Sequence, residues 1–372
     1  MPTLDETIHA LQKRYGSNVI MKASEKPTYP RIKTGVLGLD VRIGGGVPLG
    51  AMTILSGFES TGKTTVACKT IANAQKTCRQ CFQPIQQFVD DETGELTYAC
   101  DCKAPTPMRV VYIDVEGTLD LSWTAALGVD VDAVRLVVPD YAEQALDILD
   151  ALVRTGEVDL IILDSLAALA PTTEIEKSTE DWQVGLQARL LGKMCRKLTA
   201  SWNSLGIDNP RKPAVIAINQ LREKMVLHGD PITMPGGNAI RFFASIILRF
   251  RNAGWVTSNG KKEGTRVGAE IAFRQMKNKT AAQHEEGVFK LYNVSHGDIV
   301  KGDVNTAEMI IEQGVLLGVI HKGGSWLSYG IEGTESFVKA QGEVKFTQQV
   351  MENPDLFQEL QDVILAMAVS DN

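Results

Sequence analysis

Residues 57–65 of this 372-residue chain read GFESTGKTT and continue from the apolar run AMTILS at 51–56. Gly57, Gly62, Lys63 and Thr64 have the spacing of a phosphate-binding P-loop, which needs a strand before it and a helix after it. The glycines let backbone N–H groups face phosphate oxygens, Lys63 adds a cation, and the Thr64 hydroxyl suits Mg²⁺. A chance glycine turn is the competing interpretation, but the strand–loop–helix context favours a nucleotide site.

Apolar runs alternate with helical stretches along the chain. The expected strands are AMTILSG, RVVYIDVE, VRLVVP, VDLIILDS and AVIAINQ, and helices are expected between several of them, at 143–156 and 183–205. Nearly continuous apolar strands separated by helices predict an α/β fold, with a mostly parallel sheet covered by helices on both faces.

The expected organisation is an N-terminal helix with its linker (1–34), a nucleotide-binding core (35–302) and a small C-terminal α/β lobe (303–372). The first helix is predicted over 4–15, where apolar residues recur at helical spacing. Further helices are predicted near 305–318 and 354–368 in the lobe.

Composition limits the classes of function. No stretch approaches the ~18 apolar residues of a membrane span, and the N-terminus lacks a signal-peptide core, so we expect a soluble cytoplasmic protein. The net charge is −7, which excludes a chain that is basic throughout. Residues 241–279 nevertheless hold nine Lys/Arg against two Asp/Glu, so positive potential is concentrated there.

Polar side chains follow several of the expected strands. Asp164 ends one strand and suits a partner of bound Mg²⁺, although a turn or cap aspartate is the alternative. Asp114 and Glu116 end another, and Glu116 is the better candidate to orient a water because it lies beyond the last apolar residue. Asn219 and Gln220 end a third, where they could sense a terminal phosphate or simply cap the strand.

Six motifs together resemble the bacterial RecA-type recombinases. They are GFESTGKTT, YIDVEGTLD, LIILDSLAAL, INQLREKM, PGGNAIRFFAS and MKNKTAA, in the order and approximate spacing of that family. The resemblance covers roughly 5–76 and 108–365. It implies a RecA-type ATPase core and an N-terminal helix used in polymerisation.

The resemblance also implies nucleotide roles. Lys63, Glu116 and Gln220 are the expected catalytic residues, with Glu116 positioning the water and Gln220 linking the γ-phosphate to a DNA loop. Trp123 is expected against adenine, although a core tryptophan is the alternative. The residues assigned to ATP and Mg²⁺ are Gly57, Glu59, Ser60, Thr61, Gly62, Lys63, Thr64, Thr65, Asp120, Trp123 and Asp164, with Lys277 and Lys279 reaching the ATP of a neighbouring protomer.

Two loops match the DNA-binding loops of the family, at 173–184 and 222–238. Pro235 departs from the pattern, because a threonine is expected there. Arg189 and Arg196 lie seven residues apart on one face of the helix after the first loop, where surface ion pairs are the alternative. The expected DNA-binding residues are Arg189, Arg196, Arg222, Gly236, Gly237, Asn238 and Arg241.

The implied function is a DNA-dependent ATPase that forms helical filaments on single-stranded DNA, pairs it with homologous duplex DNA and exchanges strands in recombination and repair. A nucleoid-associated location follows from the same resemblance. A non-recombinogenic RecA-fold ATPase, such as a ring motor or a regulatory filament, is the alternative. A metabolic P-loop kinase would need an acceptor pocket for which the sequence has no signature.

Residues 77–107 interrupt what is otherwise a short helix-to-strand connection. Cys78-x-x-Cys81 and Cys100-x-Cys102 can supply four thiolates to a structural Zn²⁺, and DDETGE between them predicts a hairpin, as in a zinc ribbon. Free thiols or a redox pair are the alternatives. We expect this insertion to project away from the nucleotide and the DNA loops. Two further cysteines, Cys68 and Cys195, are expected as buried small apolar residues.

Overall fold

The computed structural model describes residues 2–16, 20–22, 24, 28, 30–85, 87–89, 96–98, 100, 102, 104–172, 185–207, 209–223, 232–261, 263–281, 286–297, 299–334 and 337–370.

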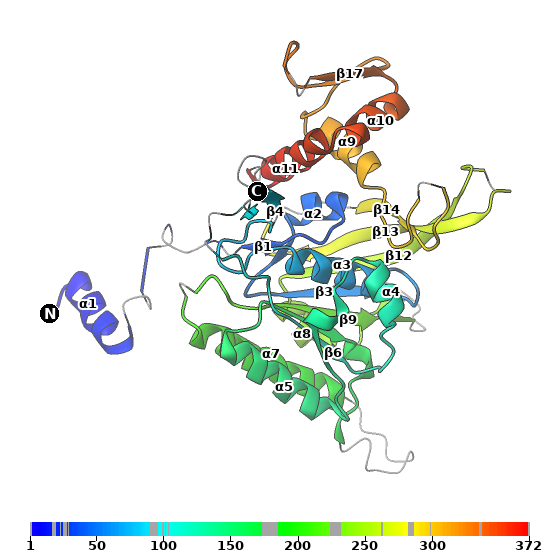
Figure 1. The fold of residues 1–372 in the computed structure, drawn as a ribbon. Helices are drawn as coiled ribbons and strands as arrows, with labels where there is room; N and C mark the ends of the chain where they lie inside the picture. Colours follow the sequence, from blue (N-terminus) through cyan, green and yellow to red (C-terminus); the bar gives the residue numbers. More distant parts are fainter. Residues whose placement is uncertain are drawn as a thin grey trace.

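An eight-stranded sheet of order β14-β13-β12-β3-β9-β8-β6-β7 forms the centre of the fold (Figure 1). In this order, the six strands β12, β3, β9, β8, β6 and β7 run parallel to one another. Strands β13 and β14 add an antiparallel edge next to β12. This confirms the mostly parallel sheet expected from the apolar runs. Its strands are β3 Met52–Gly57, β6 Val110–Asp114, β7 Val134–Val137, β8 Leu160–Asp164, β9 Ala214–Gln220, β12 Ile246–Thr257, β13 Arg266–Asn278 and β14 Glu286–Tyr292.

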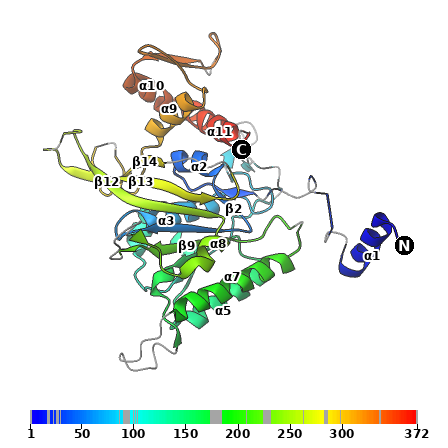
Figure 2. The ribbon, with the colours of Figure 1, turned by 180° about the vertical axis from the view of Figure 1, so that it is seen from behind.

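The central strands are buried on both faces. In β8, Leu160 and Ile162 belong to one buried cluster, whereas Ile161 and Leu163 belong to another, because successive side chains of a strand point to opposite faces. The layers of helices lie above and below the sheet in Figures 1 and 2. One contains α2 Leu37–Ile43 and α3 Lys63–Gln75, and the other contains α5 Ala142–Thr155, α7 Leu186–Ser204 and α8 Gly237–Phe243.

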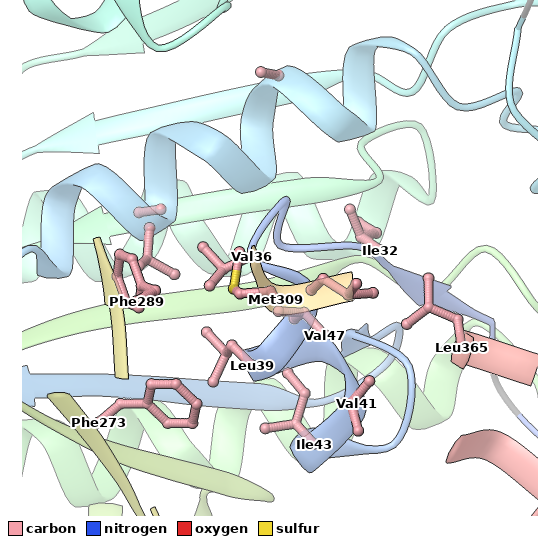
Figure 3. Close-up of a cluster of buried hydrophobic side chains, with 14 of the residues drawn as sticks. Ile32, Val36, Leu39, Val41, Ile43, Val47, Phe273, Phe289, Met309 and Leu365 are labelled. Carbon is pink, nitrogen blue, oxygen red and sulfur yellow. The ribbon is translucent and has the colours of Figure 1, made fainter. Parts of the chain in front are cut away.

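The C-terminal lobe packs on the first of these layers. Figure 3 shows Leu39 of α2 in one buried cluster with Phe273 of the sheet and with Met309 and Leu365 of the lobe. The expected helices near 305–318 and 354–368 are present, but α10 was not predicted, since Phe346 and Val350 are its only buried residues. The elements of the lobe are α9 Thr306–Leu316, β15 His321–Gly323, β16 Trp326–Tyr329, β17 Val338–Gln341, α10 Glu343–Glu352 and α11 Pro354–Ser370.

The N-terminal helix α1 spans Leu4–Tyr15, as predicted, and begins with a capping box between Thr3 and Glu6. None of its residues is buried, and Leu4 and Leu11 are exposed. The short elements of the core are β1 Arg31–Ile32, β2 Val47–Pro48, β4 Gln87–Val89, β5 Leu96–Tyr98, α4 Leu121–Ala126, β10 Arg222–Glu223 and β11 Ile232–Thr233. Among the described helices, none is both long and apolar enough to span a membrane.

Candidate functional site

The predicted P-loop joins the end of β3 to the start of α3. Gly62 caps the helix with φ of 84°, and a Cβ on it would lie 2.5 Å from Ile271 Cδ1, so only glycine fits there. Lys63 is buried and its Nζ donates to Phe58 O at 2.5 Å. Burial lowers the pKa of Lys63, and nearby carboxylates, Asp164 first among them, partly raise it again. Glu59, Ser60, Lys63 and Thr64 of this loop line one cavity.

Thr64 and Asp164 provide a pair of oxygen ligands across this cavity. Thr64 Oγ1 donates to Asp164 Oδ2 at 3.2 Å, and the Tyr112 hydroxyl donates to the same oxygen at 2.6 Å. Burial raises the pKa of Asp164 to about 6, although the hydrogen bond from Tyr112 opposes that shift. A half-buried carboxylate beside a hydroxyl offers the oxygen ligands that Mg²⁺ prefers, so the residues fit this ion.

Glu116 and Asp114, which the sequence left as rivals, have different surroundings. Both Asp114 oxygens accept backbone bonds, from Gly117 N at 2.8 Å and Leu119 N at 3.0 Å. Glu116 instead lines the cavity, where its Oε1 accepts from Ser165 Oγ and, at 3.3 Å, from Gln220 Nε2. Asp114 therefore holds the loop, and Glu116 has the position of a water-orienting carboxylate.

The two strand-end amides, Asn219 and Gln220, also have different surroundings. Gln220 lines the cavity with Glu116, whereas Asn219 Nδ2 donates to Pro235 O at 2.9 Å and ties the start of α8 to β9. The same cavity, of about 300 Å³, brings together most of the predicted nucleotide residues. Those that line it are Glu59, Ser60, Lys63, Thr64, Glu116, Asp120, Trp123, Asp164 and Gln220.

The position of Trp123 is compatible with both of the interpretations offered for it. It lines the cavity and also packs against the main buried cluster. Asp120 caps α4 by accepting from Trp123 N at 3.0 Å, and Lys301 Nζ lies 5.5 Å from the centroid of the Trp123 ring. The ring is thus held at the mouth of the cavity, where an adenine could stack on it.

Lys277 and Lys279 do not reach this cavity within one chain. Their ammonium groups donate to Phe242 O, at 2.9 and 2.7 Å, at the carboxyl end of α8. Burial, and the neighbouring Lys279, lower the pKa of Lys277 to about 8. Lys277 lines a separate groove of about 680 Å³ with Asn238 and Arg241, two predicted DNA residues. The predicted residues therefore divide between two surfaces of the chain.

The remaining predicted DNA residues lie around α7 and α8. Arg189 and Arg196 are exposed on α7, and Arg222 is exposed in the β10–β11 hairpin. Gly236 and Gly237 both have positive φ at the start of α8, and a Cβ on Gly236 would lie 2.2 Å from Ile240 Cδ1. The first predicted loop, 173–184, and the tip of the second lie outside the described residues.

The four cysteines of the insertion converge. The Sγ atoms of Cys78, Cys81, Cys100 and Cys102 all lie within 4.8 Å of one another. Burial raises the pKa of the Cys78 thiol, but backbone amides, led by that of Cys81, outweigh it and lower the pKa to about 6. Four thiols at this separation fit a tetrahedral metal site. The other two cysteines, Cys68 and Cys195, are buried.

The base of the insertion lies at the amino-terminal edge of the sheet. Arg79 Nε lies 3.1 Å from Asp159 Oδ2, directly before β8, while Asp164 ends the same strand at the nucleotide cavity. Strands β4 and β5 pair antiparallel, as the expected hairpin requires, whereas the predicted turn DDETGE at 90–95 lies outside the described residues. The cysteine cluster and the nucleotide cavity thus lie at opposite ends of the strands.

Sequence reasoning missed Tyr112, which lines the cavity, and Ser165, whose hydroxyl donates to Glu116. Tyr112 lies two residues before Asp114 in β6, and β6 pairs with β8 so that Asp114 lies opposite Asp164. That register, which the sequence alone does not give, brings the Tyr112 hydroxyl to Asp164. Ser165 directly follows Asp164, and its position in the motif was the available signal.

A P-loop at the carboxyl edge of a mostly parallel sheet, with Asp164 and Glu116 around one cavity, defines a RecA-type P-loop ATPase core. A family model described as the RecA N-terminal domain matches residues 2–99 and 91–297. The chain belongs to the RecA family.

Relatives match over almost the whole chain. Protein RecA of Aquifex pyrophilus is 36% identical over 366 residues, covering 97% of this chain and 90% of the relative. Protein RecA of Thermus aquaticus is 36% identical over 370 residues, covering 98% and 94%. Protein RecA of a Sulfurovum species is 35% identical over 364 residues, covering 96% and 90%.

Proposed function

We propose that this chain is an ATP-driven DNA recombinase that forms filaments on single-stranded DNA, pairs it with homologous duplex DNA and exchanges strands. One observation carries the link between ATP and DNA. Gln220 Nε2 contacts Glu116 Oε1 at 3.3 Å in the nucleotide cavity, and Arg222, two residues later, begins the predicted DNA loop. A change at the γ-phosphate can therefore move the loop through one short stretch of backbone.

The proposed ATPase roles follow from the contacts. The P-loop amides and Lys63 hold the phosphates, and Trp123 stacks on the base. Thr64 and Asp164 hold Mg²⁺, which neutralises charge on the phosphates when it is bound. Glu116 accepts a hydrogen bond from the attacking water and aims it at the γ-phosphate, while Gln220 contacts that phosphate. Catalysis rests on positioning and charge, as in other phosphoryl transfers.

Filament formation has support in two exposed surfaces of the single chain. The apolar stripe of α1, including Leu4 and Leu11, is exposed, and burial on a neighbouring protomer would stabilise it. Lys277 and Lys279 lie beside exposed Phe242, away from their own chain's ATP cavity. We propose that they complete the ATP site of the next protomer.

Electron microscopy with single-stranded DNA and a non-hydrolysable ATP analogue tests this function. Helical filaments that require both the DNA and the analogue are the expected result. Closed rings would favour a ring motor instead. Filaments without homologous pairing in a strand-exchange assay would favour a regulatory filament.

We also propose that Cys78, Cys81, Cys100 and Cys102 bind one structural Zn²⁺. Four cysteine ligands leave zinc no open position, so this site has no catalytic role. Purified protein should carry about one zinc per chain, and replacing Cys81 and Cys102 by serine should remove it. Serine at buried Cys68 is the matched control and should leave the zinc content unchanged. Zinc-free protein from a reducing preparation in zinc-containing medium would overturn the assignment.

A further inference from the structure

We infer that the four-cysteine site is a metal-dependent clasp on the ATPase sheet: metal binding holds Arg79 against the buried Asp159 at the start of β8. The inference rests on the zinc site proposed above and adds its role in the fold. Arg79 is a positioning residue here, because its guanidinium contacts Glu157 and Asp159 and it does not line the nucleotide cavity.

Arg79 sits inside the metal-binding loop, between two of the proposed ligands. Its backbone N donates to Thr106 O at 2.9 Å, and Cys78 forms a bridge with Pro107, so both arms of the insertion meet at this residue. Its side chain is only 7% exposed and reaches Asp159, directly before β8. The loop that binds metal therefore also aims the guanidinium.

Asp159 is the receiving group, and its side chain is fully buried. Its carboxylate accepts from Arg79 Nε at 3.1 Å, from Arg79 Nη2 at 3.4 Å and from Arg109 N at 2.8 Å. Its backbone N donates to Arg109 O, and its backbone O accepts from Ala214 N. Asp159 thus joins the starts of β6, β8 and β9, and a buried carboxylate there is costly unless Arg79 compensates its charge.

The loop has a conformation that needs an external constraint. Phe82, directly after Cys81, has φ of 63°, a region that a bulky side chain rarely occupies. Its N–H donates to Cys78 O at 2.8 Å and closes a tight turn around Arg79. A metal bound to Cys78 and Cys81 fixes both ends of this turn, whereas four free thiols would leave the turn to relax.

The distance along β8 indicates which part of the fold metal loss should leave intact. From Asp159 to Asp164, five residues of strand span about 17 Å. Metal removal should therefore loosen the amino-terminal edge of the sheet and lower the melting temperature, while the nucleotide cavity keeps its groups. ATP turnover at a temperature well below melting should change less than twofold.

The experiment compares full-length wild type with Arg79→Met, and uses Arg109→Met as the control. Arg109 is an exposed arginine that contacts Glu157, as Arg79 does, but among the described residues its guanidinium forms no ion pair with Asp159 and acts on that carboxylate as a nearby charge. Zinc content and melting temperature are measured before and after chelation. In wild type and Arg109→Met, chelation should lower the melting temperature by about 5–10 °C. Zinc-loaded Arg79→Met should have a lower melting temperature than wild type before chelation. Chelation should then lower its melting temperature by less than half as much as in wild type.

Each result bears on a separate claim. An equal fall on chelation in wild type and Arg79→Met would overturn the clasp while leaving the zinc site intact. Absence of zinc from wild type would overturn both the site and its metal dependence. If Arg79→Met does not fold, Arg79→Lys is used instead, because it keeps the positive charge but cannot form both hydrogen bonds to Asp159. Amide exchange at residues 159–161 is then the readout, and protection equal to wild type with and without zinc would refute the clasp.

Discussion

Replacing Glu116 by glutamine should abolish most ATP hydrolysis without disturbing the fold. The Glu116 Oε1 atom accepts from Ser165 Oγ and Gln220 Nε2, and a glutamine oxygen can accept both bonds. What is lost is the negative charge that attracts the proton of the attacking water. Such groups contribute typically ~10²-fold or more, or about 2.7 kcal/mol of transition-state stabilisation. We therefore expect kcat to fall by that factor, with the KM for ATP and the melting temperature nearly unchanged.

Asp114→Asn is the matched comparison, because it removes the same charge two residues away. Both Asp114 oxygens accept backbone N–H groups, so an amide nitrogen would leave one buried donor unpaired, at about 1–3 kcal/mol. We expect a lower melting temperature and a smaller loss of kcat. Coupled ATPase assays measure kcat, and calorimetry measures the melting temperature of each variant. Glu116→Gln turnover within about threefold of wild type would reject Glu116 as the water-orienting group.

Three further predictions concern charge. Burial raises the pKa of Asp40 to about 7, above its unfolded value of ~4, so its contribution to stability falls as pH rises between those values. The gain in melting temperature of Asp40→Asn over wild type should therefore grow by several degrees from about pH 4 to pH 7, and a gain independent of pH would refute this. Mixing Lys63→Ala with Lys277→Ala protein should restore some ATPase activity if sites are shared between protomers; none at any ratio, in co-assembled filaments, would refute sharing. Arg241→Ala should flatten the salt dependence of DNA binding, by about one unit of log–log slope if Arg241 contacts phosphate, and an unchanged slope would remove it from the interface.

Local patterns were enough to predict the sheet. The apolar runs around Ile54, Ile113, Ile162 and Ile216 became parallel strands because residues buried on both faces must be apolar throughout. Helix α10 was missed because only two of its side chains are buried. A short helix held by so few contacts has little periodicity to read.

The nucleotide site was predictable where its residues are adjacent in sequence, and less so where they meet across strands. The P-loop spacing alone placed Lys63 and Thr64. The choice of Glu116 over Asp114 followed from its position past the strand, but the reason lies in the two backbone donors that occupy Asp114. Tyr112 depended on strand register, and the pairing of Arg79 with Asp159 spans 80 residues. No local pattern specifies such a contact.

That last contact makes removal of the insertion testable. Cys78 and Pro107 are paired, so a short turn can replace residues 79–106 without moving the strands. Such a deletion removes the guanidinium that faces Asp159, which should destabilise the fold by about 3–5 kcal/mol. Adding Asp159→Asn removes the charge and keeps an oxygen that can accept from Arg109 N, so it should recover much of that loss. In the full-length chain the same substitution should destabilise, because it takes from Arg79 its buried partner and leaves the guanidinium only the exposed carboxylate of Glu157. Urea unfolding of the four proteins measures the difference. If Asp159→Asn has the same effect with and without the insertion, the insertion does not neutralise Asp159.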